Sequence, residues 1–277
     1  MSVENKPLLD YIREGRTLTH LPVIDFHGHL GISSDFYYIP YNTPTKMVDH
    51  MDRIGVDHLL TFTIAVGTDP APGNQYQYEA ARQFPDRFTP LTLLRGDKPA
   101  DWPAMIDDGI ANGAKGLKLI CVYQDVTESS VDWTPAFERV RHHNPVVLNH
   151  NWDSPERLQY WAEQFPEITF IIGHAYHGYG GVVASLPNVY MSTCASFVTP
   201  PYASITELWQ TMPAEKILFG SDCQDLDMCL SIGSIAYAQK IPENDKRKIL
   251  GGNALQLMNK LGWDTEVQRR FEHDPGL

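Results

Sequence analysis

Several apolar runs in this sequence end on side chains that can bind a metal or move a proton. The first run, residues 23–29, ends on His27 and His29, which are separated by Gly28 alone. Side chains alternate between the two faces of a β-strand, so both imidazoles would project to one side, where neutral ring nitrogens can bind a divalent cation. The motif alone is as typical of two hydrogen-bonded histidines at a strand end as it is of a metal site.

Three further apolar runs end on side chains of the same kinds, namely His150, His174 and Asp222. Taken singly, each is more simply explained as a capped or core polar residue. Taken together they are informative, because a closed barrel of parallel strands brings the C-terminal ends of all its strands to one mouth. We therefore expect imidazoles and a carboxylate to gather at one end of a barrel.

The elements that would position these side chains alternate along the chain. Apolar runs with strand character are separated by segments with helical spacing. We expect an α/β fold, a (β/α)8 TIM barrel, because the repeat count favours it and no GxGxxG motif follows the first strand. Pro90 makes the third run the least regular, since proline cannot donate to the ladder. The eight runs are 23–29, 58–64, 88–94, 116–120, 146–150, 169–174, 189–192 and 216–222.

The chain reads as a single domain over residues 1–277, since no linker or compositional break divides it. A barrel of this type typically needs about 250 residues. The barrel core would span about residues 22–222. We expect a short extra helix in residues 7–15 and C-terminal helices within residues 226–262.

Composition excludes several classes of function. The net charge of −12 argues against a nucleic-acid partner, and no run approaches the ~20 apolar residues of a membrane span. The N-terminus carries no signal-peptide core, and the cysteines follow no zinc-finger or CxxC spacing. We expect a cytoplasmic protein with reduced thiols that acts on a small molecule. The cysteines are Cys121, Cys194, Cys223 and Cys229.

The order of these motifs resembles the amidohydrolase superfamily, and the likeness covers residues 22–262. Two further segments, 113–119 and 248–254, are similar to the branch that contains aminocarboxymuconate semialdehyde decarboxylase. The superfamily motifs are His27-Gly28-His29, His150, His174 and Gly220-Ser221-Asp222.

The resemblance implies one divalent metal ion, with His27, His29, His150 and Asp222 as ligands. Zinc is the first choice and manganese the alternative, because mixed imidazole and carboxylate sites accept several metals. Asp222 would take a proton from an activated water, and His174 would hold that water or polarise the substrate oxygen. Some superfamily members bridge two metals with a lysine, but the position of Lys118 inside a strand favours a single ion.

Substrate contacts are expected from the loops after the strands. Arg95 could bind a carboxylate bidentately, although a surface ion pair is the commoner fate of an arginine. The aromatic segment 31–41 would form a lid or a subunit contact, which leaves a homo-oligomer open. The remaining candidates, which would line an aromatic and hydrogen-bonding pocket, are Tyr123, Asn151, Trp152, Tyr176 and His177.

The leading hypothesis is a metal-dependent hydrolase that cleaves a C–N or C–O bond of a small polar molecule. The same residues would serve a metal-dependent, non-oxidative decarboxylase of a small aromatic or unsaturated carboxylate, which is the alternative. A third class comprises barrels that bind without chemistry, and the branch also contains lactone-cleaving members without a metal. The intact set of five ligand-type residues counts against a barrel without chemistry.

Overall fold

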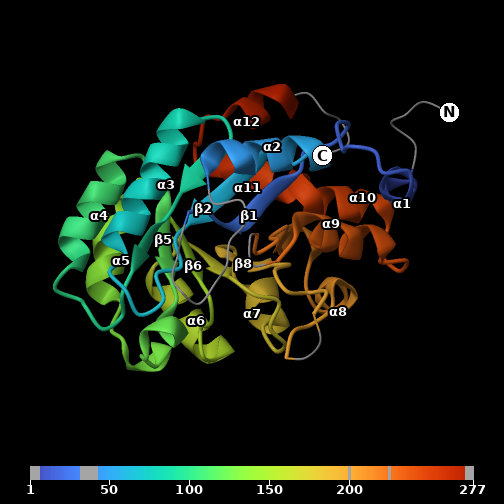
Figure 1. Cartoon of the computed structure of the whole chain (residues 1–277). Coiled ribbons are helices and arrows are strands. Elements are labelled where there is room, and N and C mark those ends of the chain that lie inside the picture. Colours follow the sequence, from blue (N-terminus) through green and yellow to red (C-terminus); the bar gives the residue numbers. More distant parts are fainter. Residues whose placement is uncertain (1–6, 32–42, 199–200, 224–225, 272–277) are drawn as a thin grey trace.

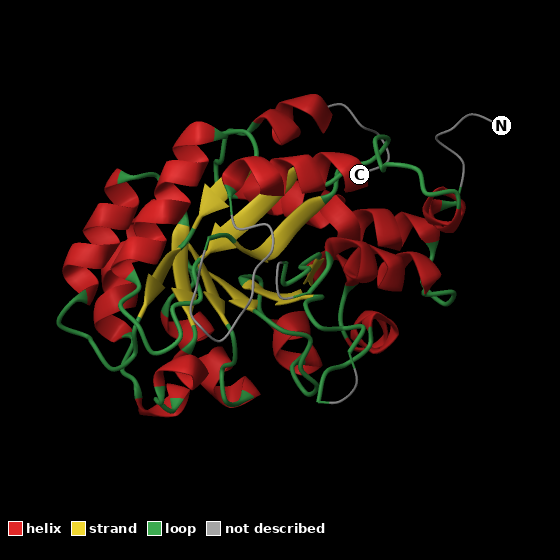
Figure 2. Cartoon of the chain, in the orientation of Figure 1, coloured by secondary structure: helices red, strands yellow, loops and turns green. Residues whose placement is uncertain are grey.

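Parallel strands form the centre of the molecule and helices surround them (Figures 1 and 2). The computed structural model describes residues 7–31, 43–198, 201–223 and 226–271. The strands coincide with the predicted runs, apart from one interruption near Pro90. They are β1 (Ile24–His29), β2 (His58–Phe62), β3 (Phe88–Pro90), β4 (Thr92–Leu94), β5 (Gly116–Leu119), β6 (Val146–Asn149), β7 (Thr169–Ile172), β8 (Val189–Ser192) and β9 (Ile217–Leu218).

Neighbouring strands pair in parallel, in the orders β1-β2-β3 and β4-β5-β6-β7-β8-β9. The two sets are joined through the break, because the Leu91 amide donates to the Thr61 carbonyl at 2.9 Å. At the other seam, the Phe26 amide donates to the Phe219 carbonyl at 2.8 Å. These bonds connect the last strand to the first, as a barrel requires. The prediction of an α/β (β/α)8 fold is therefore confirmed.

The helices follow local signals in the sequence. The Thr43 hydroxyl caps α2 by accepting from the Lys46 amide at 3.3 Å, and Gly55, with φ +96°, ends that helix. Lys248–Gly252 forms a π-helical turn. The helices are α1 (Leu8–Arg13), α2 (Pro44–Ile54), α3 (Ala71–Gln83), α4 (Trp102–Ala111), α5 (Thr134–Val140), α6 (Pro155–Gln164), α7 (Gly180–Ser185), α8 (Ile205–Thr211), α9 (Met228–Tyr237), α10 (Glu243–Arg247), α11 (Asn253–Lys260) and α12 (Glu266–Phe271).

The hydrophobic core has an outer and an inner part, as the alternation of strand side chains requires. Val147 and Phe170 belong to the outer part, which packs against the helices, whereas Leu148 and Ile171 belong to the inner part. Apolar residues of α11 join the inner part. No helix of the described chain is long and apolar enough to cross a membrane.

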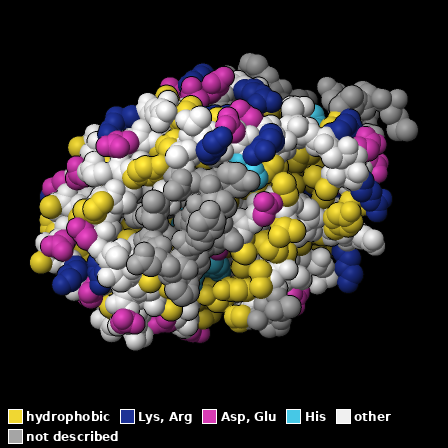
Figure 3. All heavy atoms as spheres, in the orientation of Figure 1, with side chains coloured by type: hydrophobic (Ala, Val, Ile, Leu, Met, Phe, Trp, Pro, Cys, Tyr) yellow, Lys and Arg dark blue, Asp and Glu magenta, His cyan; other side chains and the backbone are white. Residues whose placement is uncertain are grey.

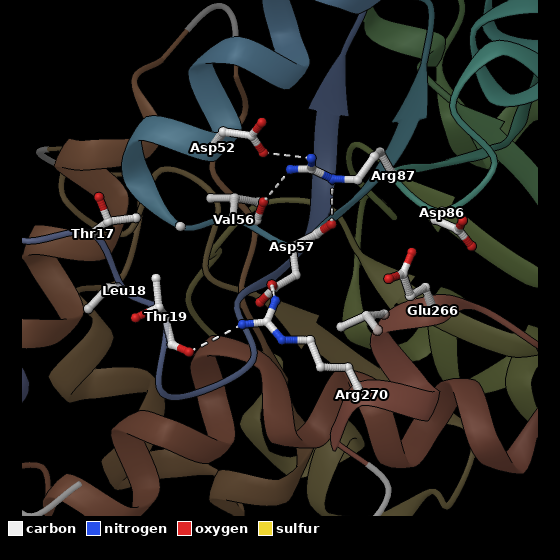
Figure 4. A pocket seen from close by; sticks show the side chains of 12 residues that line it. Thr17, Leu18, Thr19, Asp52, Val56, Asp57, Asp86, Arg87, Glu266 and Arg270 are labelled. Atoms are coloured by element: carbon white, nitrogen blue, oxygen red, sulfur yellow. Dashed lines mark hydrogen bonds and ion pairs between the residues drawn. The ribbon is translucent and has the colours of Figure 1, made fainter. Parts of the chain in front are cut away.

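A hollow of about 330 Å³ lies at the N-terminal ends of the first strands (Figure 4). Its arginines are engaged within the protein. Arg87 donates to the carbonyls of Val56 and Asp57, at 2.9 and 2.9 Å, and Arg270 of α12 donates to the Thr19 carbonyl at 3.2 Å. An Arg270–Asp57 ion pair completes the attachment of α12 to the barrel. This hollow is opposite the mouth where the predicted site lies.

Candidate active site

A β-bulge in β1 turns both histidines of the first motif into the barrel. Asp25 pairs with Leu59 but Gly28 pairs with Thr61, so β1 carries one extra residue. Gly28 faces outward, where an added Cβ atom would lie 2.4 Å from Leu59 Cδ1. Glycine is therefore required there, and His27 and His29 project to the opposite, inner side.

The Asp222 carboxylate lies between these two imidazoles. Its Oδ1 atom is 3.1 Å from His27 Nε2 and 2.9 Å from His29 Nε2. Asp222 adopts φ +61°, a conformation that costs about 1 kcal/mol or more for a non-glycine residue. Its amide donates to the His27 carbonyl at 2.8 Å, so the barrel seam holds the strained residue in place.

Asp25 supports the site from the side away from the mouth. Its Oδ1 accepts from the amides of His27 and Ser221, at 3.0 and 3.0 Å, and its Oδ2 accepts from the Ser221 hydroxyl. Burial raises the pKa of Asp25 to about 7 despite these hydrogen bonds. The sequence marks Ser221 only as part of the Gly220-Ser221-Asp222 motif, and it marks Asp25 only as a carboxylate inside an apolar run.

His150 and His174 complete the group of imidazoles. The ring centroids of His150 and His174 are 4.2 Å apart, and those of His27 and His174 are 5.1 Å apart. Burial, assisted by the charge of Lys118, lowers the pKa of His27 to about 3 and that of His150 to about 3. Burial also brings the pKa of His174 well below its usual value. These rings are therefore neutral, as metal ligands must be.

Two further buried side chains contact the imidazoles. Lys118 Nζ lies 3.4 Å from His27 Nε2 and 4.1 Å from the centroid of the Phe62 ring. Burial lowers the pKa of Lys118 to about 7. Cys194 Sγ lies 3.2 Å from His174 Nδ1, and burial raises the pKa of this thiol well above its usual value. The sequence analysis treated Cys194 as an ordinary thiol, because its spacing matches no motif.

The donor atoms at the mouth fit a divalent ion. One ligand atom from each of His27, His174, Cys194 and Asp222 lies within 4.8 Å of the other three. This compact group contains His174 and Cys194, and it lacks two of the four predicted ligands, His29 and His150. His29 contacts the same Asp222 oxygen as His27. Neutral imidazoles beside a carboxylate are typical zinc ligands and also suit other first-row metals. The Nδ1 atoms of the buried His27 and His29 rings have no hydrogen-bond partner within the described protein. Neither ring therefore has both of its nitrogens hydrogen-bonded to protein groups.

Aromatic side chains line the mouth beside the imidazoles. The Tyr123 ring is 5.2 Å from that of His150, and the Tyr176 ring is 6.0 Å from that of His174. Tyr202, which the sequence analysis did not select, stacks 5.7 Å from His174. His177 is exposed and shares with Tyr176 a cavity of about 330 Å³ next to α7 and α8. On the face drawn in Figure 3, hydrophobic side chains gather in one area and a histidine side chain is visible beside them.

The other predicted substrate contacts have partners elsewhere. Arg95 binds Asp97 bidentately, at 2.8 and 2.9 Å, which is the ion-pair alternative stated above. Trp152 is fully buried in the hydrophobic core, 5.6 Å from the Phe170 ring, and so lies outside the mouth. Asn151 is half-buried and its side chain accepts from the Asp153 amide at 3.0 Å. From residue 32 onward, the predicted lid lies outside the described residues.

One sequence family covers most of the chain. Residues 24–259 match the family described as Amidohydrolase. No curated protein matches the chain as a whole or in part.

Solved structures share the fold. A 5-carboxyvanillate decarboxylase from Novosphingobium aromaticivorans with bound manganese has a TM-score of 0.65 and 12% identity, over 86% of this chain and 97% of its own. A probable 2-pyrone-4,6-dicarboxylic acid hydrolase from Acinetobacter baumannii has a TM-score of 0.62 and 19% identity, over 86% and 100%. A 4-oxalomesaconate hydratase from Rhodopseudomonas palustris has a TM-score of 0.63 and 16% identity, over 91% and 100%.

Proposed function

Because the chain belongs to the amidohydrolase family, we propose that it is a metal-dependent hydrolase that cleaves a C–N or C–O bond of a small polar molecule. One observation carries this proposal. The buried Asp222 carboxylate lies 3.1 and 2.9 Å from the Nε2 atoms of His27 and His29, so a group able to act as acid and base lies beside imidazoles able to bind a metal. Hydrolysis requires both at the same place.

The proposed ligands of the ion are His27, His29, His150 and Asp222. Zinc is the first choice and manganese the alternative, since the related decarboxylase fold binds manganese. When bound, such an ion acts as a Lewis acid that polarises a substrate oxygen and makes a neighbouring water more acidic. All other steps are assigned to side chains of this protein.

Asp222 is the proposed general base. Burial would raise its pKa, but hydrogen bonds from His27 and His29 outweigh burial and hold the pKa well below its usual range. Asp222 is therefore ionised, and an ionised carboxylate beside the attacking water can accept its proton and return it to the leaving group. His174 binds the substrate oxygen on which negative charge develops. Tyr123 and Tyr176 flank the imidazoles and limit the access of water.

Decarboxylation is the second candidate, and the aromatic wall supports it. The Tyr176 and Tyr202 rings are 5.2 Å apart and both approach His174, so a planar aromatic carboxylate would stack beside them. The fold is also that of a 5-carboxyvanillate decarboxylase. Arg95, the predicted carboxylate clamp, is occupied by Asp97, and we therefore rank hydrolysis first.

The experiment combines metal analysis with a small substrate panel. Untagged protein is analysed for bound metal and tested with amides, lactones and aromatic carboxylates, recording both hydrolysis products and carbon dioxide. We expect about one equivalent of metal and hydrolysis that Asp222→Asn abolishes. Asp107→Asn, which makes the same change in an exposed residue, should remain active.

Two outcomes would overturn the proposal. Release of carbon dioxide without any hydrolysis would assign the chain to the decarboxylases. Full activity with less than about a tenth of an equivalent of metal would assign it to the enzymes that work without one.

A further inference from the structure

A third apolar cluster lies at the C-terminal ends of β2, β4 and β5, apart from the outer and inner parts of the core. This mouth cluster consists of the buried Ile64, Ala65, Leu93 and Ile120, with the partly buried Val66 and Tyr123 packed against them. We propose that the mouth cluster is a binding subsite for an uncharged apolar ring of the substrate, and that Val66 determines this specificity. The inference rests on the proposed function and narrows its substrates to uncharged amides and lactones that carry such a ring.

The alternation of side chains in β4 directs the mouth cluster toward the imidazoles. Leu94 packs in the outer part of the core, so Leu93, the residue before it, faces the inside of the barrel. Leu93 pairs with Lys118 of the neighbouring strand β5. Lys118 Nζ in turn lies 3.4 Å from His27 Nε2. The mouth cluster therefore continues the inner surface on which the candidate active site is built.

Val66 and Tyr123 form the accessible surface of the mouth cluster. The ring of Tyr123 is 5.2 Å from that of His150. The Tyr123 carbonyl accepts from the amide of Gly67, the residue after Val66, at 3.2 Å. Both side chains are partly exposed, so they can contact a ligand. A substrate whose carbonyl group meets the imidazoles would thus bury an attached ring against Tyr123 and Val66.

A tight turn fixes the position of Val66. The Thr68 amide donates to the Ala65 carbonyl at 3.4 Å. Ala65 adopts φ +46°, a left-handed conformation that is unfavourable for a residue with a side chain and persists only where surrounding contacts enforce it. Arg95 supplies one such contact, because its Nη1 donates to the Thr68 carbonyl at 2.9 Å. Arg95 therefore supports the turn that presents Val66.

The charges around the mouth cluster indicate an uncharged ring. The Nε and Nη2 atoms of Arg95 donate to Asp97 at 2.8 and 2.9 Å, so all three guanidinium nitrogens have partners in the protein. The mouth cluster and the turn 65–68, all within the described chain, contain no charged side chain. A carboxylate on the ring would lose its water here without gaining a partner, which is costly.

The first test compares three amides that differ only in the group beside the amide. Benzamide carries an uncharged ring, acetamide carries a methyl group, and 4-carbamoylbenzoate carries a ring with a carboxylate. Binding to the metal-loaded protein is measured by calorimetry, or as KM where a probe is hydrolysed. We expect benzamide to bind about tenfold or more tightly than either of the others. Benzamide that binds no better than acetamide, or no better than 4-carbamoylbenzoate, would overturn the proposal.

The second test changes the subsite itself. Val66→Asp should weaken benzamide binding about tenfold or more and leave acetamide within about twofold, because only benzamide carries the ring. Val122→Asp is the matched control, since it makes the same change at a valine that is 59% exposed, and it should leave both affinities unchanged.

A milder variant keeps the test valid if the aspartate variant does not fold. Val66→Thr retains the shape of valine and adds a hydroxyl, so we expect benzamide to bind about threefold more weakly. Unchanged benzamide binding in the folded Val66 variants would show that the ring binds elsewhere. Equal weakening of acetamide would show that Val66 does not act on the ring, and would also overturn the proposal.

These measurements separate the subsite from the proposed function. Binding requires no turnover, so a protein that holds benzamide through Val66 but hydrolyses nothing would support the subsite and contradict the proposed function. Hydrolysis of the probes without any dependence on Val66 would do the reverse.

Discussion

At the scale of single residues, the contacts of His27 make it the test of the metal site. Its Nε2 atom lies 3.1 Å from Asp222 Oδ1 and 3.4 Å from Lys118 Nζ. We expect His27→Ala to retain less than about a tenth of an equivalent of metal after dialysis, because the remaining ligands are too few. His142→Ala, on the exposed surface, is the control, and metal is measured by mass spectrometry. Full retention of metal in the His27 variant would contradict the assignment.

His174 should behave differently, because we assign it to the substrate oxygen and not to the ion. His174→Asn is expected to keep the metal and to lower kcat by about a hundredfold or more, as for the loss of a donor to developing charge. Steady-state kinetics and metal analysis on the same sample check both parts. A variant that loses the metal would identify His174 as a ligand, as its place in the compact group with Cys194 allows.

The candidate residues at the strand ends could be predicted because a barrel brings those ends together. The sequence did not show the bulge that turns His27 and His29 inward, since only Gly28 hints at it. The sequence also did not show where side chains in the loops point, because the regular alternation of side chains along strands and helices does not extend into loops. Trp152 turns into the core and Cys194 turns toward His174 for this reason.

At the scale of elements, the segment Gly251-Gly252-Asn253 after α10 holds the fold together. An added Cβ atom on Gly251 would lie 2.1 Å from the Pro22 carbonyl oxygen, so the turn packs directly against the entry to β1. The side-chain Nδ2 of Asn253 donates to the carbonyls of Ala214 and Ile217, at 2.7 and 2.7 Å, and thereby holds β9.

Loss of these bonds should destabilise the protein. We expect Asn253→Ala to lower the free energy of unfolding by about 2 kcal/mol or more, because it leaves two carbonyl groups without their partner. Gln256→Ala, on the exposed side of the same helix, should change it by less than about 0.5 kcal/mol. Urea unfolding measures both, and equal effects would show that Asn253 does not anchor β9.

His58 at the start of β2 gives the fold a pH dependence. It is buried, and its ring nitrogens lie 3.0 Å from the Asp86 carbonyl oxygen and 2.8 Å from Thr89 Oγ1. Burial lowers the pKa of His58 to about 4. The unfolded chain takes up a proton near pH 6.5 that the folded chain resists, so stability falls as the pH falls from about 6.5 toward 4.

Replacing His58 should remove this contribution. Between pH 7 and pH 5, we expect the wild type to lose about 2 kcal/mol more unfolding free energy than His58→Gln, because glutamine cannot be protonated. Urea unfolding at the two pH values gives the difference. Identical losses in the two proteins would mean that His58 does not resist protonation in the fold.

The strands could be predicted because their apolar runs are long and regular. The break in the third run, the π-helical turn and the last helix could not be predicted in this way. Pro90 indicated a weak third strand, and the ladder breaks at Leu91. The predicted C-terminal helices correspond to α9, α10 and α11, but the π-helical turn Lys248–Gly252 and the short helix α12 lie beyond what spacing reveals. Both depend on packing against distant residues, namely Pro22 and Asp57.

At the scale of the whole molecule, a bound ion would tie the first strand to the last. Because only the folded protein presents the ligands together, binding should stabilise it by about 2.7 kcal/mol at a metal concentration one hundred times the Kd. Removal of metal with a chelator should lower Tm by about 5 °C or more, and zinc or manganese should restore it. Differential scanning fluorimetry checks this, with His27→Ala as a variant whose Tm should not respond. Equal Tm values with and without metal would argue against a resident ion.

We propose that residues 1–277 form one domain, with the barrel core and C-terminal helices as predicted. The inner core joins residues of β1 and β6 to apolar residues of α11, so the C-terminal helices share the core of the barrel. An ion pair between Arg270 and Asp57 attaches α12 to the barrel (Figure 4).

The seam between β1 and the segment after β9 has a consequence for how the protein is made. His29 and Asp222 are separated by 193 positions, yet their side chains meet across this seam. On the ribosome, the histidines emerge long before the carboxylate is translated. A partly synthesised chain therefore carries the imidazoles without the carboxylate, and on the proposed function every copy would stay inactive until the segment after its final strand has been translated.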